Sequence, residues 1–126
     1  MRYAIGVNIY DKKEGTSYDG LATIDSLGLY PSVLRIPKIQ EYIDDGKEVT
    51  TIIYDDLESV QKKISEFSVH FRREGVWSKY QKWEKSKKII RFYAVKVDSS
   101  KFPFKIGESS KKTKSGEKLQ KYESRK

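Results

Sequence analysis

Hydrophobic and polar residues alternate at the start of the chain, over residues 2–10. Every second position of this segment carries a large apolar side chain, and the four are Tyr3, Ile5, Val7 and Ile9. This period is typical of a β-strand with one buried face. The other face carries the small residues Ala4 and Gly6, so we expect another part of the protein to pack closely against it.

Further strands are predicted later in the chain. Residues 48–54 and 88–98 are rich in β-branched and aromatic residues, which strands favour, and residues 32–36 predict a shorter strand. Residues 11–20 are polar and contain glycine, which predicts a loop. Residues 21–30 fit either a short strand or a helical turn.

A helical period follows the strand at 48–54. Apolar residues recur at steps of three and four, and they are Leu57, Val60, Ile64, Phe67 and Phe71. This stripe predicts an amphipathic helix over about residues 56–73. Asp55 and Glu58 stand three apart at its start and resemble a capping box.

Shorter helices are predicted on both sides of this segment. Pro37 suits the first turn of a helix, which would end at Asp44, Asp45 and Gly46. Residues 76–83 place two tryptophans and a tyrosine at a spacing that fits another short helix.

The predicted fold class is α+β. We expect a small, mostly antiparallel sheet packed against one long amphipathic helix and one or two short helices, in a single domain over residues 1–106. Beyond Pro103 the composition changes to Lys, Ser, Gly and Glu. Residues 107–126 are therefore predicted to form a flexible basic tail.

The charge is divided unevenly along the 126 residues. Residues 1–84 hold 12 Lys and Arg and 14 Asp and Glu, a net charge of −2, whereas residues 85–126 hold 14 basic and 4 acidic residues, a net charge of +10. Such asymmetry indicates a polyanionic partner, nucleic acid above all. The competing interpretation is a lysine-rich tail that only keeps the protein in solution.

The basic residues are interleaved with aromatic ones between residues 62 and 91. Basic side chains bind phosphates and exposed aromatic side chains stack on unpaired bases, unless Trp77, Tyr80 and Trp83 belong to the core. The predicted nucleic-acid-binding residues are Arg72, Arg73, Trp77, Lys79, Tyr80, Lys82, Lys85, Lys87, Lys88 and Arg91, with Lys111, Lys112 and Lys114 of the tail.

Signals for catalysis are few. The chain has no cysteine, which excludes disulfides, thiolate zinc sites and cysteine nucleophiles. His70, the single histidine, falls within the helical stripe and is interpreted as partly buried. Asp45, Asp55, Asp56 and Glu58 would have to converge on one ion to make a metal-dependent nuclease. No pattern predicts a cofactor or a metal site.

The sequence thus predicts a non-enzymatic protein that binds DNA or RNA largely without sequence preference. The alternative is a viral or accessory interaction protein, an inhibitor or adaptor that binds an acidic protein surface. A metal-dependent nuclease is the third hypothesis. The absence of an apolar run near 18 residues and of a signal peptide predicts a cytoplasmic protein without integral membrane association.

Overall fold

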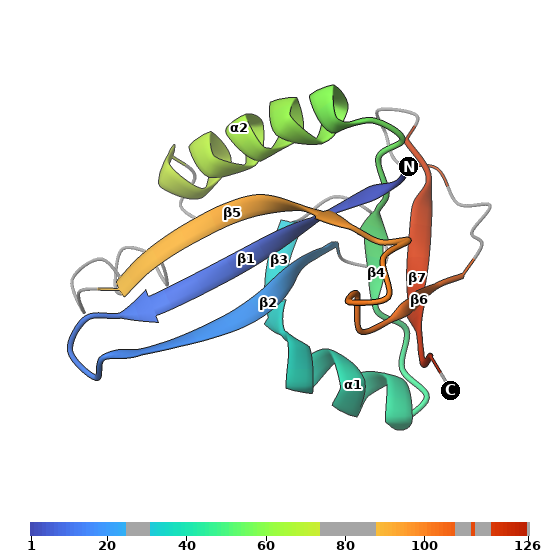
Figure 1. The fold of residues 1–126 in the computed structure, drawn as a ribbon, viewed down its shortest axis with the longest axis horizontal. Helices are drawn as coiled ribbons and strands as arrows, with labels where there is room; N and C mark the ends of the chain where they lie inside the picture. Colours follow the sequence, from blue (N-terminus) through green and yellow to red (C-terminus); the bar gives the residue numbers. More distant parts are fainter. Residues whose placement is uncertain (25–30, 74–87, 108–111, 113–116, 126) are drawn as a thin grey trace.

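A computed structural model describes residues 1–24, 31–73, 88–107, 112 and 117–125. It shows an α+β fold in which a curled antiparallel sheet carries two helices (Figure 1). The strand order is β5-β1-β2-β4-β7-β6, and β3 also pairs with β2. Because every pairing is antiparallel, the prediction of a mostly antiparallel sheet is confirmed.

Three long strands lie side by side at one end of this sheet. They are β1 (Tyr3–Asp11), β2 (Thr16–Ile24) and β5 (Lys88–Lys96). β1 and β5 follow the predicted strands at residues 2–10 and 88–98. The loop predicted over residues 11–20 is wrong for its second half, where β2 begins at Thr16.

Hydrogen bonds to Asp11 stabilise the short turn between β1 and β2. The Asp11 carboxylate Oδ1 accepts hydrogen bonds from the backbone N–H groups of Lys13 and Glu14 at 2.9 and 3.2 Å. Gly15 donates to the Asp11 carbonyl oxygen at 2.8 Å and adopts a φ of 69°, which glycine tolerates at no steric cost. The polar residues after the turn are mostly exposed on the first half of β2.

The remaining strands are shorter. They are β3 (Pro31–Arg35), β4 (Thr50–Ile52), β6 (Lys105–Ile106) and β7 (Leu119–Glu123). β3 matches the strand predicted at residues 32–36, and β4 is a shorter form of the strand predicted at 48–54. Tyr54, just beyond β4, exchanges two backbone hydrogen bonds with Tyr3 of β1. This contact joins β1 to the chain beyond β4, although β2 lies between the two strands in the sheet.

The two helices pack against different faces of the sheet (Figure 1). α1 (Ile36–Asp44) belongs with a core cluster that contains Ile39, Leu21 and Ala4. α2 (Leu57–Arg73) belongs with a second cluster, in which Val60 packs with Ile5. The residues at even positions of β1 therefore face α1 and those at odd positions face α2.

The start of α1 agrees with the prediction, whereas the start of α2 corrects it. Pro37 occupies the first turn of α1, and Gly46 follows its end. At α2 the capping residue is Asp56 instead of Asp55, because Asp56 accepts hydrogen bonds from the N–H and hydroxyl of Ser59. Leu57, the first residue of α2, is 48% exposed, which corrects its place in the predicted apolar stripe, whereas Val60 is buried as predicted.

The C-terminal segment corrects the predicted tail. Leu119 and Tyr122 of β7 are 1% and 3% exposed, and β7 pairs with β4 and with β6. Phe102 and Phe104 pack against Tyr122, with ring centroids 5.9 and 5.6 Å away. Residues 119–123 therefore belong to the folded body, not to a flexible tail.

Neither helix within the described ranges is long and apolar enough to cross a membrane.

Candidate functional site

One half of the sheet face that carries α1 remains open. The pairing register aligns Asn8 of β1 with Asp19 of β2 and with Arg91 of β5. Residues aligned across antiparallel strands share a face, and so do residues two apart in one strand. Tyr10 and Tyr93 therefore lie on the same face as this row. We call Asn8, Tyr10, Asp19, Arg91 and Tyr93 the open sheet face.

The open sheet face lies where α1 does not cover the strands. In Figure 1 the hairpin end of β1 and β2 extends beyond α1. Tyr10 and Tyr93 are each 39% exposed, and Asp19 and Arg91 are exposed as well. Two aromatic rings and a guanidinium are thus presented on one side of a rigid sheet.

Tyr93 owes its position to Gly6 on the neighbouring strand. A Cβ atom at Gly6 would stand 2.6 Å from Cε2 of the Tyr93 ring and 2.9 Å from a methyl group of Val95. The ring therefore lies against the β1 backbone, in space that only glycine leaves free. The sequence-based expectation of close packing against Ala4 and Gly6 is confirmed, and Tyr93 is one of the groups that pack there.

The row between the two tyrosines is polar. Asn8 donates a hydrogen bond from Nδ2 to Oδ1 of Asp19 at 3.0 Å. Its amide oxygen and the second carboxylate oxygen of Asp19 take no part in this bond. Arg91 is aligned with Asn8 and forms no ion pair with any residue in the described ranges. The row therefore offers hydrogen-bond acceptors beside a guanidinium that pairs with no carboxylate of the described residues.

A cavity of about 440 Å³ adjoins Tyr93. Leu21, Val95 and Phe102 contribute apolar walls, and Lys101 contributes an exposed cationic side chain. Lys96 also borders the cavity, but its alignment with Tyr3 places its side chain on the opposite face. The volume falls in the range of pockets that hold small organic groups. The cavity thus combines an aromatic neighbour, apolar walls and positive charge at one end of the open sheet face.

The electrostatic surroundings keep the Tyr93 hydroxyl protonated. Partial burial raises the pKa of Tyr93, and the negative charge of Asp19 raises it further. At neutral pH the hydroxyl is therefore a hydrogen-bond donor, and the ring remains uncharged and suited to stacking.

The structure places only part of the predicted binding residues. Arg91 lies on the open sheet face. Lys88 begins β5 opposite Asp11, and Arg72 and Arg73 end α2, but their side chains lie outside the described part. Lys112 is exposed, and its backbone forms an isolated antiparallel β-bridge with Lys118. The other predicted residues lie outside the described ranges; they are Trp77, Lys79, Tyr80, Lys82, Lys85, Lys87, Lys111 and Lys114.

Sequence reasoning missed most of the open sheet face. Asn8, Tyr10, Asp19 and Tyr93 were not predicted as site residues. A signal was present in β1, because Asn8 and Tyr10 occupy the face opposite the large apolar residues. Asp19 carried no such signal, because β2 was not recognised as a strand that starts before residue 20.

The four carboxylates of the nuclease hypothesis lie at the ends of two different helices. Asp45 follows the end of α1, whereas Asp55, Asp56 and Glu58 lie at the start of α2. Among the residues that the structure describes, no group of three or more His, Asp or Glu side chains is arranged to hold a metal ion. His70 is in α2, and its side chain lies outside the described part.

Comparison of the chain with protein-family models, with curated proteins and with solved structures found no match.

Proposed function

We propose that this protein binds single-stranded nucleic acid on the open sheet face and performs no catalysis there. The observation that carries the proposal is the exposure of Tyr10, Arg91 and Tyr93 on one side of two adjacent strands. Sheet surfaces with exposed aromatic rings are a common platform on which unpaired bases stack.

The distances along the strands suit a nucleic-acid chain. Tyr10 lies four residues beyond Gly6, the residue aligned with Tyr93, which corresponds to about 13 Å at the rise of an antiparallel strand. Two rings at this spacing can each stack on a base, while Arg91 between them contacts a phosphate. Duplex DNA does not fit this arrangement, because its bases are already stacked on each other.

The polar row adds recognition of base edges. The Asn8 amide oxygen and the second Asp19 carboxylate oxygen, which take no part in the bond between these residues, suit the amino groups of cytosine, adenine or guanine. The carboxylate of Asp19 also disfavours a phosphate at that position, so the backbone is expected to run along Arg91 and Lys101. The cavity beside Tyr93 would take a base turned toward the protein.

The rest of the chain supports this surface. In the proposal α2 is a scaffold whose apolar stripe continues through Phe67 and Phe71 as one long amphipathic helix. The basic residues of the sequence between Arg73 and Lys88 precede β5, whose first residue Lys88 is aligned with Asp11 at the hairpin end. They would add phosphate contacts that are independent of sequence, as would Lys111, Lys112 and Lys114.

Fluorescence anisotropy with labelled 12-nucleotide DNA and RNA strands tests the proposal. Tyr93→Leu keeps an apolar side chain over Gly6 but removes the ring, and we expect it to weaken binding by about 5- to 100-fold, because a stacked base contributes about 1–3 kcal/mol. Tyr93→Phe should bind as the parent does.

Arg91→Gln tests the phosphate contact. The log–log dependence of affinity on salt should become shallower by about 0.7, the value for one contact to a single strand. Arg35→Gln is the matched control, since Arg35 is also exposed but aligns with Gly20 and thus lies on the other face. If the parent binds no single strand at low salt, the proposal is wrong and the acidic protein surface becomes the preferred partner.

A further inference from the structure

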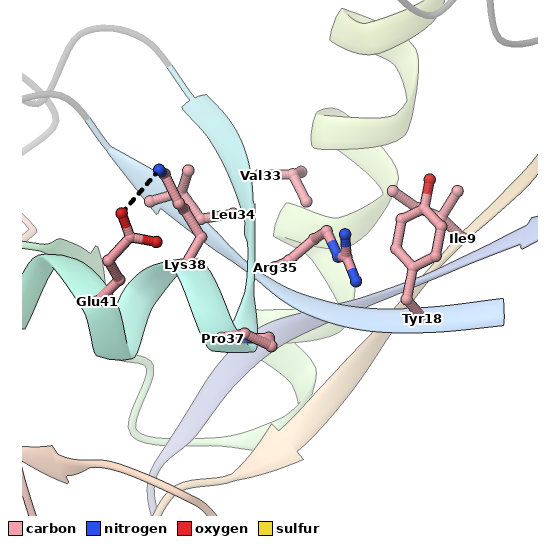
Figure 2. A pocket seen from close by; sticks show the side chains of 8 residues that line it. All are labelled: Ile9, Tyr18, Val33, Leu34, Arg35, Pro37, Lys38 and Glu41. Carbon is pink, nitrogen blue, oxygen red and sulfur yellow. Dashed lines mark hydrogen bonds and ion pairs between the residues drawn. The ribbon is translucent and has the colours of Figure 1, made fainter.

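A second cavity, of about 450 Å³, lies at the edge of the sheet where β3 turns into α1. Figure 2 shows the side chains that line it: Tyr18 and Arg35 at one end, and Lys38 and Glu41 of α1 at the other. Ile9, Val33 and Leu34 supply apolar walls between them. This cavity is separate from the open sheet face, because Ile9, Tyr18 and Val33 occupy the opposite face of the strands.

Arg35 and Tyr18 form a stacked pair within this cavity. The guanidinium carbon of Arg35 lies 4.6 Å from the centroid of the Tyr18 ring, within the range of a cation–π contact. The contact occupies one face of the guanidinium, and no hydrogen bond joins its N–H groups to another residue that the structure describes. In the described part of the chain no carboxylate forms an ion pair with Arg35.

The charges that line the cavity do not cancel. Lys38 Nζ lies 3.2 Å from Oε1 of Glu41, so these two charges neutralise each other. Arg35 is left as a positive charge without an acidic partner among the lining residues. A planar cation beside apolar walls favours a ligand with a complementary anionic group, which a guanidinium can bind with two parallel hydrogen bonds.

We propose that this cavity binds a small amphiphilic anion, an aromatic or otherwise apolar body that carries one carboxylate or a similar group. The apolar body lies against Ile9 and Val33, and the anionic group accepts hydrogen bonds from Arg35. This binding site is independent of the function proposed above, because it uses none of the residues of the open sheet face or of the cavity beside Tyr93.

A pair of matched probes tests the charge requirement. 1-Naphthoate and the neutral 1-naphthalenemethanol have the same ring system and differ in the charged group. We expect naphthoate titrated into 15N-labelled protein to shift the amide signals of Tyr18, Val33, Arg35 and Lys38. The neutral analogue should bind at least about tenfold more weakly, because it cannot form charge-assisted hydrogen bonds.

Variants of Arg35 test the assignment. Arg35→Gln should reduce the affinity for naphthoate by about tenfold or more. The affinity of Arg35→Lys should lie between that of the parent and that of Arg35→Gln, because lysine keeps the charge but loses the planar fork. Arg91→Gln is the control and should bind naphthoate like the parent, whereas Arg35→Gln should keep the parent affinity for single strands. Amide spectra of each variant verify that it is folded.

Three outcomes would overturn the proposal. They are equal affinity for the charged and neutral probes, an unchanged naphthoate affinity in folded Arg35→Gln, and shifts centred on residues outside the cavity. Failure of oligonucleotide binding leaves these results unaffected, so the two proposals are tested separately.

Discussion

The ring of Tyr93 lies against Gly6 so closely that a single methyl group on the glycine would stand 2.6 Å from Cε2 of the ring. The two residues are aligned partners on β5 and β1. Gly6 is not one of the glycines with a positive φ, which are Gly15 and Gly46. The Tyr93 ring, and not the backbone conformation, therefore explains the need for glycine at this position.

Gly6→Ala is therefore expected to move Tyr93 away from the sheet. The added Cβ also meets a methyl group of Val95 at 2.9 Å, so both neighbours must shift, and overpacking of this kind typically destabilises a protein by about 1–3 kcal/mol. Urea unfolding of Gly6→Ala measures the loss. Gly15→Ala is an informative comparison, because no atom stands near its Cβ position and its cost comes from the positive φ alone.

The C-terminal strand leads to a prediction opposite to that for a flexible tail. Leu119 is 1% exposed, and its truncation to alanine should cost about 2–5 kcal/mol through lost burial and a residual cavity. The neighbouring exposed Lys118 is the control, and Lys118→Ala should change the free energy of unfolding by less than about 0.5 kcal/mol. Removal of residues 118–126 should leave a chain that no longer unfolds cooperatively.

A soluble, cooperatively folded truncation would contradict this assignment. Thermal melts followed by circular dichroism distinguish the two results directly, because a dispensable tail would leave the midpoint of the transition within a few degrees of that of the full chain.

The sequence identified the elements that carry their own periodic signal. β1 and β5 were recognised by their alternation and composition, and α1 by Pro37 and the glycine beyond its end. In each case the information lies within about ten neighbouring residues. The α+β class and the antiparallel sheet followed from these elements alone.

The elements that sequence reasoning missed depend on distant partners. The apolar residues of β7, Leu119 and Tyr122, stand three apart, which fits neither the period of two nor a long helical stripe. They are buried because β7 pairs with Thr50–Ile52, some seventy residues away. The open sheet face was missed for a related reason, because only the register brings Tyr10, Arg91 and Tyr93 to one side.

The cap of α2 provides a test of a local assignment. Asp56 accepts hydrogen bonds from the Ser59 N–H at 2.7 Å and from its hydroxyl at 3.0 Å, and the backbone bond in particular lowers the pKa of Asp56. Asp56→Ala should therefore lower the melting temperature at neutral pH. Asp55→Ala should leave it nearly unchanged, and the reverse order would restore Asp55 as the capping residue.

Two buried tyrosines are expected to make the fold sensitive to alkali. Burial is the main cause that raises the pKa of Tyr54 and of Tyr122 above the ordinary value for tyrosine, and nearby Glu117 and Glu66 raise that of Tyr54 further. Because the folded state holds these protons more tightly than the unfolded state, their contribution to stability is complete below pH of about 10 and is lost as the pH rises above it.

Tyr122→Phe isolates one of these two groups. The buried Tyr122 hydroxyl forms no hydrogen bond with any residue that the structure describes, and the neighbouring Thr51 donates to the carbonyl oxygen of Ala22 at 2.9 Å. Removing an unsatisfied buried hydroxyl should leave stability at pH 7 unchanged or raise it by about 1 kcal/mol.

Above pH of about 10 the variant should lose less stability than the parent, since one of the two titrating groups is gone. Urea unfolding of both proteins between pH 7 and pH 11 measures the difference, with the exposed Tyr10→Phe as the control that should follow the parent. A Tyr122→Phe variant that is destabilised at pH 7, or that loses stability in alkali as steeply as the parent does, would show that the hydroxyl is hydrogen-bonded or reached by water.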